Sequence, residues 1–178
     1  MIKIGDTKIR SPFIAGPTKY SWRDRLELAI KHADIIAIQT HGKWAGSHNL
    51  VKLAKEETDK PILAKGIHWK DKEIGDLLYL GADYVLVVGR MPPSKFLDRC
   101  MLEPTCLKEI EDYPKGVKVV WNARNIVNGW PKKETFEEAI EKWDGWLCQA
   151  SMIKRIEDIH SSADAIMIGE CLELLREM

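Results

Sequence analysis

Short apolar runs alternate with amphipathic stretches along the whole chain, and this alternation restricts the possible folds more than any other feature. The runs are five or six residues long and most are nearly continuous in apolar residues, as expected for strands buried on both faces. We predict eight strands, at residues 13–17, 34–39, 61–65, 83–88, 100–104, 117–121, 145–149 and 164–168. Because helical segments separate nearly all of them, the sequence favours parallel βα units closed into a (β/α)8 barrel.

Amphipathic helices are predicted between these strands, because apolar residues recur there at helical spacing while charged residues fill the other positions. Residues 22–32 and 70–83 carry the clearest pattern, and residues 132–143 and 154–164 repeat it. No linker, low-complexity tract or block of like charge interrupts the alternation, so we expect residues 1–178 to form a single domain.

The chain is short for this architecture. Its 178 residues give about 22 residues for each βα unit, whereas such barrels typically need at least ~200 residues in all. We therefore expect a compact TIM barrel with shortened helices and loops. The tightest link is 89–99, where two prolines leave room for about one helical turn. The sequence does not decide whether the barrel closes across this link. A doubly wound sheet is the competing fold, but no glycine-rich turn follows the first predicted strand.

Charge and composition exclude several classes of function. Lys plus Arg and Asp plus Glu both number 27, so the formal net charge is zero and no strong field favours nucleic acid or a membrane surface. No apolar run approaches the ~18 residues of a membrane-spanning helix, and the N-terminal residues lack the apolar core of a secretory signal. The four cysteines lack CxxC spacing, which favours free thiols in a cytoplasmic protein.

The histidines do not predict a metal site or an organic cofactor. The five of them follow no HExxH or similar ligand pattern. Residues 41–49, which hold two of the five, favour a connector that ends in a helix cap at Ser47 over a loop that cradles phosphate. The sequence leaves the oligomeric state open.

Polar side chains close three of the predicted strands, where a barrel of this kind carries its chemistry. Lys65, Glu103 and Asn122 end the third, fifth and sixth strands or directly follow them. Neighbouring strands lie ~4.8 Å apart, so the backbones of Lys65 and Glu103 start about 10 Å apart and their long side chains can meet. We therefore predict an acid and a base on opposite sides of one small substrate.

Five stretches of the sequence resemble the indole-3-glycerol phosphate synthase family, among them residues 33–47 and 149–172. "PILAKGIHWKDKEIGDLLYLGADYVLVV" is similar to that family's third unit, in which a "PVLRKDF" strand precedes a helix and "GADAVLL". "CMLEPTCLKEI" resembles its "LVEVHDEEEL" stretch, and "VVWNARNI" resembles "IGINNRDL". The resemblance runs in order over nearly the whole chain, which implies the same barrel fold.

The resemblance also implies an activity, namely closure of the indole ring of 1-(o-carboxyphenylamino)-1-deoxyribulose 5-phosphate with loss of carbon dioxide and water, without a cofactor. Lys65 corresponds to the family's general acid, Glu103 to the partner acid/base and Asn122 to an asparagine that orients the substrate. The residues expected to bind the substrate or its phosphate are Lys19, Arg124, Ser151, Gly169 and Glu170.

Several positions depart from the family's pattern. The family's first strand carries a glutamate and a second catalytic lysine, where a gap-free match puts Gly16 and Thr18, and Lys19 lies one place later. Its seventh-strand glutamate corresponds to Ala150, and its phosphate-site glycine to Met152, a residue that adopts positive φ poorly. The family's N-terminal extension also has no counterpart before the first predicted strand. We therefore expect an incomplete catalytic set and a weakened phosphate site.

Two other functions stay open at this point. The chain could be another lyase or isomerase for a phosphorylated substrate, with Lys65 as an acid or as a Schiff-base nucleophile. Alternatively, it could be a barrel without catalysis that serves as a binding or scaffold protein. In that case Lys65 would be a strand-end lysine that reaches water, Glu103 a rim carboxylate in an ion pair and Asn122 a turn residue. The fold alone does not decide between them.

Overall fold

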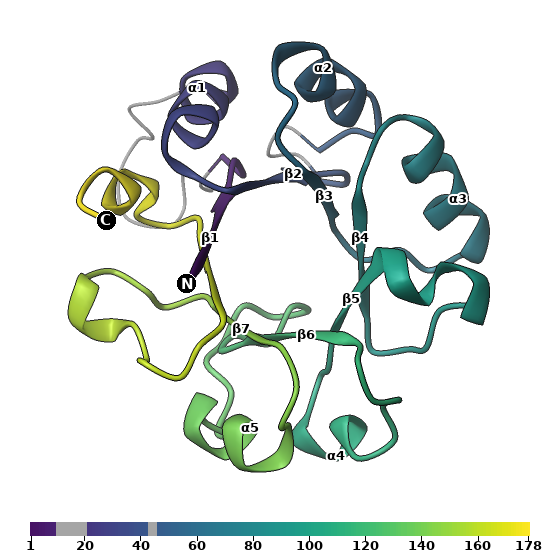
Figure 1. The fold of residues 1–178 in the computed structure, drawn as a ribbon, viewed down its shortest axis with the longest axis vertical. Coiled ribbons are helices and arrows are strands. Elements are labelled where there is room, and N and C mark those ends of the chain that lie inside the picture. Colours follow the sequence, from purple (N-terminus) through teal and green to yellow (C-terminus); the bar gives the residue numbers. More distant parts are fainter. Residues whose placement is uncertain (10–20, 43–45) are drawn as a thin grey trace.

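Eight parallel strands close into a barrel in the computed structural model, which describes residues 1–9, 21–42 and 46–178. Each strand pairs with its neighbours in chain order, and the last pairs with the first (Figure 1). The strands are β1 (Ile2–Asp6), β2 (Ile35–Gln39), β3 (Ile62–Lys65), β4 (Tyr84–Val88), β5 (Cys100–Glu103), β6 (Lys118–Asn122), β7 (Leu147–Ala150) and β8 (Ala165–Ile168). The predicted fold class, a (β/α)8 TIM barrel, is confirmed.

Helices cover the outside of the ring (Figure 1). The helical segments of the described residues are α1 (Trp22–His32), α2 (Asn49–Glu57), α3 (Asp71–Tyr79), α4 (Leu107–Ile110) and α5 (Phe136–Lys142), together with the 3-10 helices η1 (Ser94–Arg99), η2 (Ile156–Asp158) and η3 (Leu172–Arg176). The capping boxes that open α1 and α5 use Ser21 and Thr135, each accepting an N–H from three residues later. Within the described part of the chain, no helix has the length and hydrophobicity needed to cross a membrane.

Most elements lie where the sequence predicts them. Seven of the eight strands begin and end within two residues of their predicted positions. Helix α1 spans the predicted 22–32, and α3 and α5 lie inside the predicted 70–83 and 132–143. The chain leaves α3 through Gly81, whose φ of +111° favours glycine.

Two short links fold differently from a regular βα unit. Residues 154–164 form only the 3-10 turn η2, so the helix predicted there is wrong. The carboxylate of Asp158 accepts the backbone N–H groups of Lys154 at 2.9 Å and Arg155 at 3.0 Å, which closes a compact turn in place of a helix. Residues 89–99 hold η1, and β4 pairs directly with β5, so the barrel closes across this link.

The first strand lies earlier in the chain than predicted. β1 occupies Ile2–Asp6, whereas the predicted strand 13–17 lies outside the described residues. The segment is hard to recognise because it offers only two apolar side chains among charged residues and a glycine. Gly5 lets β1 approach α1 closely, since a Cβ at this position would lie 2.9 Å from the Cβ of Ala29.

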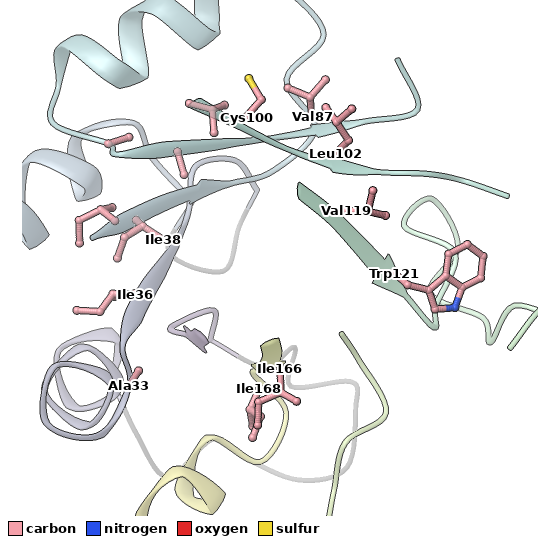
Figure 2. Packing of buried hydrophobic residues seen from close by; sticks show 14 of the residues in the cluster. Ala33, Ile36, Ile38, Val87, Cys100, Leu102, Val119, Trp121, Ile166 and Ile168 are labelled. Carbon is pink, nitrogen blue, oxygen red and sulfur yellow. The ribbon is translucent and has the colours of Figure 1, made fainter. Parts of the chain in front are cut away.

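The strand residues pack in two layers. Their outward side chains pack under the helices, as Figure 2 shows for residues of β2, β4, β5, β6 and β8. Their inward side chains form a second cluster inside the ring, which includes Ile4, Ala37, Leu63, Leu86, Met101, Val120, Cys148 and Ala165. Because side chains alternate along a strand, the residue two positions after each of these faces the same interior.

Candidate active site

Four polar side chains line the mouth of the barrel at the carboxyl ends of its strands. They end β1, β3, β5 and β6: Asp6, Lys65, Glu103 and Asn122. Each lies two residues beyond a side chain of the inner cluster, so alternation directs it inward. Asp6, Glu103 and Asn122 are only 4%, 2% and 7% exposed, and the side chain of Lys65 is 16% exposed. We call these four residues the polar ring.

Lys65 forms a buried ion pair with Asp6. Its Nζ lies 2.5 Å from Oδ2 of Asp6, and Oδ1 of Asp6 accepts the N–H of Lys8 at 3.0 Å. Burial by itself would raise the pKa of Asp6, but the charge and the hydrogen bond of Lys65 hold that pKa below its usual value. Burial would likewise lower the pKa of Lys65, but Asp6 and then Glu103 raise it. Lys65 is therefore an ammonium group at neutral pH and carries a proton to donate, although its raised pKa makes it a weaker acid than a free lysine.

Glu103 has the opposite protonation behaviour from Asp6. Burial raises the pKa of Glu103, and the charges of Lys65 and Lys132 and a hydrogen bond from Asn122 only partly oppose this. Its Oε1 is buried and has no hydrogen-bond partner among the described residues. Two carboxyl groups that interact with one lysine thus have pKa values shifted apart, a pattern that assigns acid and base roles.

Asn122 is held in one orientation by two hydrogen bonds. Its Oδ1 accepts the backbone N–H of Arg124 at 2.9 Å and the hydroxyl of Ser151 at 2.6 Å. The side-chain NH2 group is therefore the part of Asn122 that donates to Glu103. These contacts connect the ends of β5, β6 and β7 at the mouth.

The turn after β7 has an unusual backbone. Ser151 and Met152 have φ values of +67° and +58°, a left-handed conformation that costs a residue with a Cβ about 1–2 kcal/mol. The sequence suggests that Met152 would resist this conformation, but the structure adopts it with methionine in place. Strain of this kind is often found at functional sites.

The loop after β8 meets the loop after β6. Arg124 Nη2 lies 3.9 Å from Oε2 of Glu170, so these two predicted binding residues pair with each other. Gly169 approaches the polar ring closely, since a Cβ there would lie 3.0 Å from Oδ2 of Asp6. The Gly169 carbonyl accepts a hydrogen bond from the guanidinium of Arg25. A phosphate group near Arg124 would compete with Glu170 for its guanidinium.

The structure therefore brings together most of the residues that the sequence singles out. Lys65, Glu103 and Asn122 lie in one polar ring, but the hydrogen bond of Lys65 goes to Asp6 and not to Glu103. The predicted binding residues other than Lys19 lie on the loops that follow β6, β7 and β8. Lys19 lies outside the described residues, as do the two departures from the family at positions 16 and 18.

Sequence reasoning missed three charged residues of the site, Asp6, Lys8 and Lys132. Loss of solvent and then the charge of Lys65 lower the pKa of Lys8, while Asp6 opposes them. The Nζ of Lys132 lies 4.2 Å from the ring centre of Trp121. The alternation of isoleucines in residues 2–6 could have indicated a strand that ends in an acid, whereas the two lysines lie in loops without any such signal.

Comparison with known proteins gives one relative in sequence. No known family model matches the chain. The chain is 25% identical to an indole-3-glycerol phosphate synthase of Petrotoga mobilis (strain DSM 10674 / SJ95) over 181 aligned positions, which cover 87% of this chain and 72% of that protein. This identity is too low to assign the chain to that family.

Comparison with solved structures supports the fold. The chain superposes on a 3-hexulose-6-phosphate synthase with a TM-score of 0.68 and 17% identity, covering 99% of this chain and 97% of that one. It superposes on the N-acetylmannosamine-6-phosphate 2-epimerase from Clostridium perfringens with a TM-score of 0.67 and 16% identity, covering 96% and 87%. At such identities the likeness establishes the barrel. All three similar proteins are enzymes named for phosphorylated compounds.

Proposed function

We propose that this protein is an enzyme that acts on a small phosphorylated substrate at the mouth of its barrel, with Lys65 as the proton donor. The observation that carries the proposal is the buried ion pair between Lys65 and Asp6, which keeps the lysine charged beside Glu103. The names of the similar proteins support the substrate class. We also propose that this enzyme is cytoplasmic, as the spacing of its cysteines predicts.

The specific reaction that we propose is ring closure of 1-(o-carboxyphenylamino)-1-deoxyribulose 5-phosphate. Lys65 donates a proton to the carbonyl oxygen of the substrate as the new carbon–carbon bond forms, and carbon dioxide then leaves. The resulting hydroxyl leaves as water after a second protonation, while a proton is removed from the substrate. Glu103 is the partner acid/base of this step, and Asn122 orients the substrate. The sequence match to a synthase of this kind supports the reaction.

The phosphate of the substrate would bind among the loops after β6, β7 and β8. Arg124 supplies a guanidinium that suits phosphate, and Gly169 leaves room for close approach. The left-handed backbone at Ser151 is of the kind that turns N–H groups toward an anion. In this proposal the phosphate displaces Glu170 from Arg124, and Lys19 is a further candidate contact.

A turnover assay tests ring closure directly. The full chain is incubated with the proposed substrate and the indole product is followed by fluorescence. We expect turnover by the parent and a loss of at least about 10²-fold in Lys65→Gln, as for removal of a general acid. Lys118→Gln is the matched control, because Lys118 begins β6 at the opposite end of the barrel. Absence of product with the parent protein would reject ring closure.

A second candidate is an isomerase or another lyase for a phosphorylated sugar. It is favoured by Ala150, where the synthase family carries a glutamate, and by the structural likeness to an epimerase. Exchange of substrate protons with deuterated water, followed by NMR, would detect such an activity on phosphorylated sugars. Schiff-base chemistry needs a neutral amine, which the raised pKa of Lys65 opposes, and borohydride trapping would reveal it. If none of these reactions occurs, a non-catalytic binding barrel becomes the better account.

A further inference from the structure

Two histidines and a glutamate meet beside the mouth of the barrel, outside the residues assigned above. His41 follows β2, His48 directly precedes α2, and Glu73 lies in the first turn of α3. Their ligand atoms all lie within 4.8 Å of one another, and each side chain is partly buried. Nε2 of His41 lies 3.6 Å from Oε1 of Glu73. This distance is too long for an ordinary N–H···O hydrogen bond, so direct hydrogen bonding does not explain the contact.

A chain of hydrogen bonds behind the cluster begins at His68. Nδ1 of His68 lies 2.6 Å from the carbonyl oxygen of Leu86, which can only accept, so this nitrogen carries a hydrogen. His68 is buried, with only 1% of its surface exposed. Its Nε2 lies 2.8 Å from the hydroxyl of Thr40, which also lies 3.1 Å from the carbonyl oxygen of Lys65, a second acceptor for its single hydrogen.

The same hydroxyl of Thr40 also contacts His41. Thr40 Oγ1 lies 2.9 Å from Nδ1 of His41, and when its hydrogen is donated to Lys65 or His68 it accepts from Nδ1–H. In that arrangement Nε2, the nitrogen that lies near Glu73, is the one available to a metal ion. Histidines that bind metals usually donate their other N–H to such a second group, which orients the ring.

Glu73 provides an independent observation. Its Oε2 is buried and has no hydrogen-bond partner among the described residues. A buried oxygen without a partner is costly, and a cation bound to the carboxylate would remove that cost. His48 provides the third donor, and its side chain makes no capping hydrogen bond to α2. Its ring is therefore not committed to the helix end.

We propose that His41, His48 and Glu73 bind one divalent transition-metal ion, with Zn²⁺ as the best fit. Nitrogen and oxygen ligands at 2.0–2.2 Å in a tetrahedral site lie about 3.3 Å apart, close to the contact between His41 and Glu73. The proposal requires the His48 ring to rotate so that the longer separations, up to 4.8 Å, become shorter. Three protein ligands leave a fourth position for water or for an oxygen of a bound molecule. The proposal is independent of the proposed function, since none of the three ligands belongs to the polar ring.

Zinc titration tests the site. The full chain, freed of metal with a chelator, is titrated with Zn²⁺ in a calorimeter, and we expect one ion per chain with a dissociation constant of about 10 µM or tighter. His48→Ala and Glu73→Gln each remove a ligand and should weaken binding by at least about 100-fold, whereas Thr40→Val should weaken it by about 10–100-fold through His41. His160→Ala is the matched control, because His160 lies in the link between β7 and β8 and should leave binding unchanged.

Circular dichroism of each metal-free variant checks that it folds, and Co²⁺ absorption identifies the donors. The proposal expects d–d bands of a site with nitrogen and oxygen ligands, without the thiolate-to-metal band that a cysteine site would give. Absence of binding in the parent protein would overturn it. Stoichiometric binding that persists in both His48→Ala and Glu73→Gln would also overturn it, because the ion would then occupy another site.

Discussion

Lys65 stays charged inside the barrel because the carboxylate of Asp6 raises its pKa. In Asp6→Asn the lysine loses its partner, and breaking a buried pair in this way typically costs about 3–5 kcal/mol of unfolding free energy. We expect urea unfolding at neutral pH to report a loss of this size. The control variant Lys118→Gln should have nearly the same free energy of unfolding as the parent. If Asp6→Asn also matched the parent, the ion pair would not form.

The same pair predicts how stability depends on pH. Because the folded-state pKa of Asp6 lies below its ordinary 3.8, the ionised carboxylate stabilises the fold above that pH, and this stabilisation is lost as the pH falls through the folded-state pKa. The free energies of unfolding of the parent and of Asp6→Asn, measured with urea from neutral to acid pH, should therefore become equal at the acid end. A constant gap between the two curves would contradict the assignment.

From the raised pKa of Glu103 we predict that replacing this residue makes the protein more stable and less active. Its pKa is raised by burial, so the charged carboxylate destabilises the fold as the pH rises above its ordinary 4.5. Glu103→Gln removes the charge at nearly constant shape, and we expect about 1 kcal/mol or more of added stability at neutral pH. The gain should vanish at pH values below 4.5, where the parent is also protonated. Turnover of the proposed substrate should fall in the same variant.

From the positive φ of Met152 we predict that a single substitution at this position stabilises the protein. Met152→Gly relieves the left-handed backbone, and we expect about 1 kcal/mol of added stability from urea unfolding. Met91→Gly is the matched control, because Met91 is about as exposed as Met152 but does not have a positive φ. That variant should lose stability, since glycine there only increases the freedom of the unfolded chain.

Single residues of the site differ in how visible they are in the sequence. Lys65, Glu103 and Asn122 follow apolar runs that are easy to recognise, so the sequence places them at strand ends. Asp6 follows a strand with two isoleucines and gives a weak signal. The metal ligands come from the loop after β2 and from α3, and their meeting depends on tertiary contacts that no spacing rule contains.

At the scale of elements, β1 depends on its packing against α1. A methyl group at Gly5 would lie 2.9 Å from Ala29 and 3.1 Å from Ala33, and overpacking of this kind costs about 1–3 kcal/mol. We expect Gly5→Ala to lower the urea midpoint accordingly. Gly75→Ala, inside α3 and 3.6 Å from its nearest neighbour, should instead raise stability by about 0.5–1 kcal/mol. Equal effects of the two substitutions would contradict the close contact.

The elements also explain which parts of the fold are predictable. Apolar periodicity located α1 and seven strands because these segments bury a continuous face. It failed for residues 154–164, where a side-chain cap by Asp158 competes with a helix of the same pattern. Apolar periodicity does not report local hydrogen bonds of this type, which become visible only in the folded structure.

At the scale of the whole molecule, a barrel forms from a chain shorter than usual because several outer helices shrink to one or two turns. η1, η2 and η3 replace full helices, while the strands keep ordinary lengths. The inner cluster still takes residues from every strand and the outer cluster from β2 to β8, so the barrel keeps its core under shorter outer helices. The sequence predicted this compaction from length alone, but only the pairing of β4 with β5 decides that the ring stays closed.

The pairing of Ile2 with Ala165 joins the beginning of the chain to nearly its end. During synthesis on a ribosome, β1 is made before β8. Until β8 pairs with it, the N–H and C=O groups along one edge of β1 have no partner strand. Contacts so distant in sequence form slowly. The nascent chain therefore exposes an unpaired strand edge until β8 has been made, and the few apolar groups of β1 limit what that edge can bind in the interval.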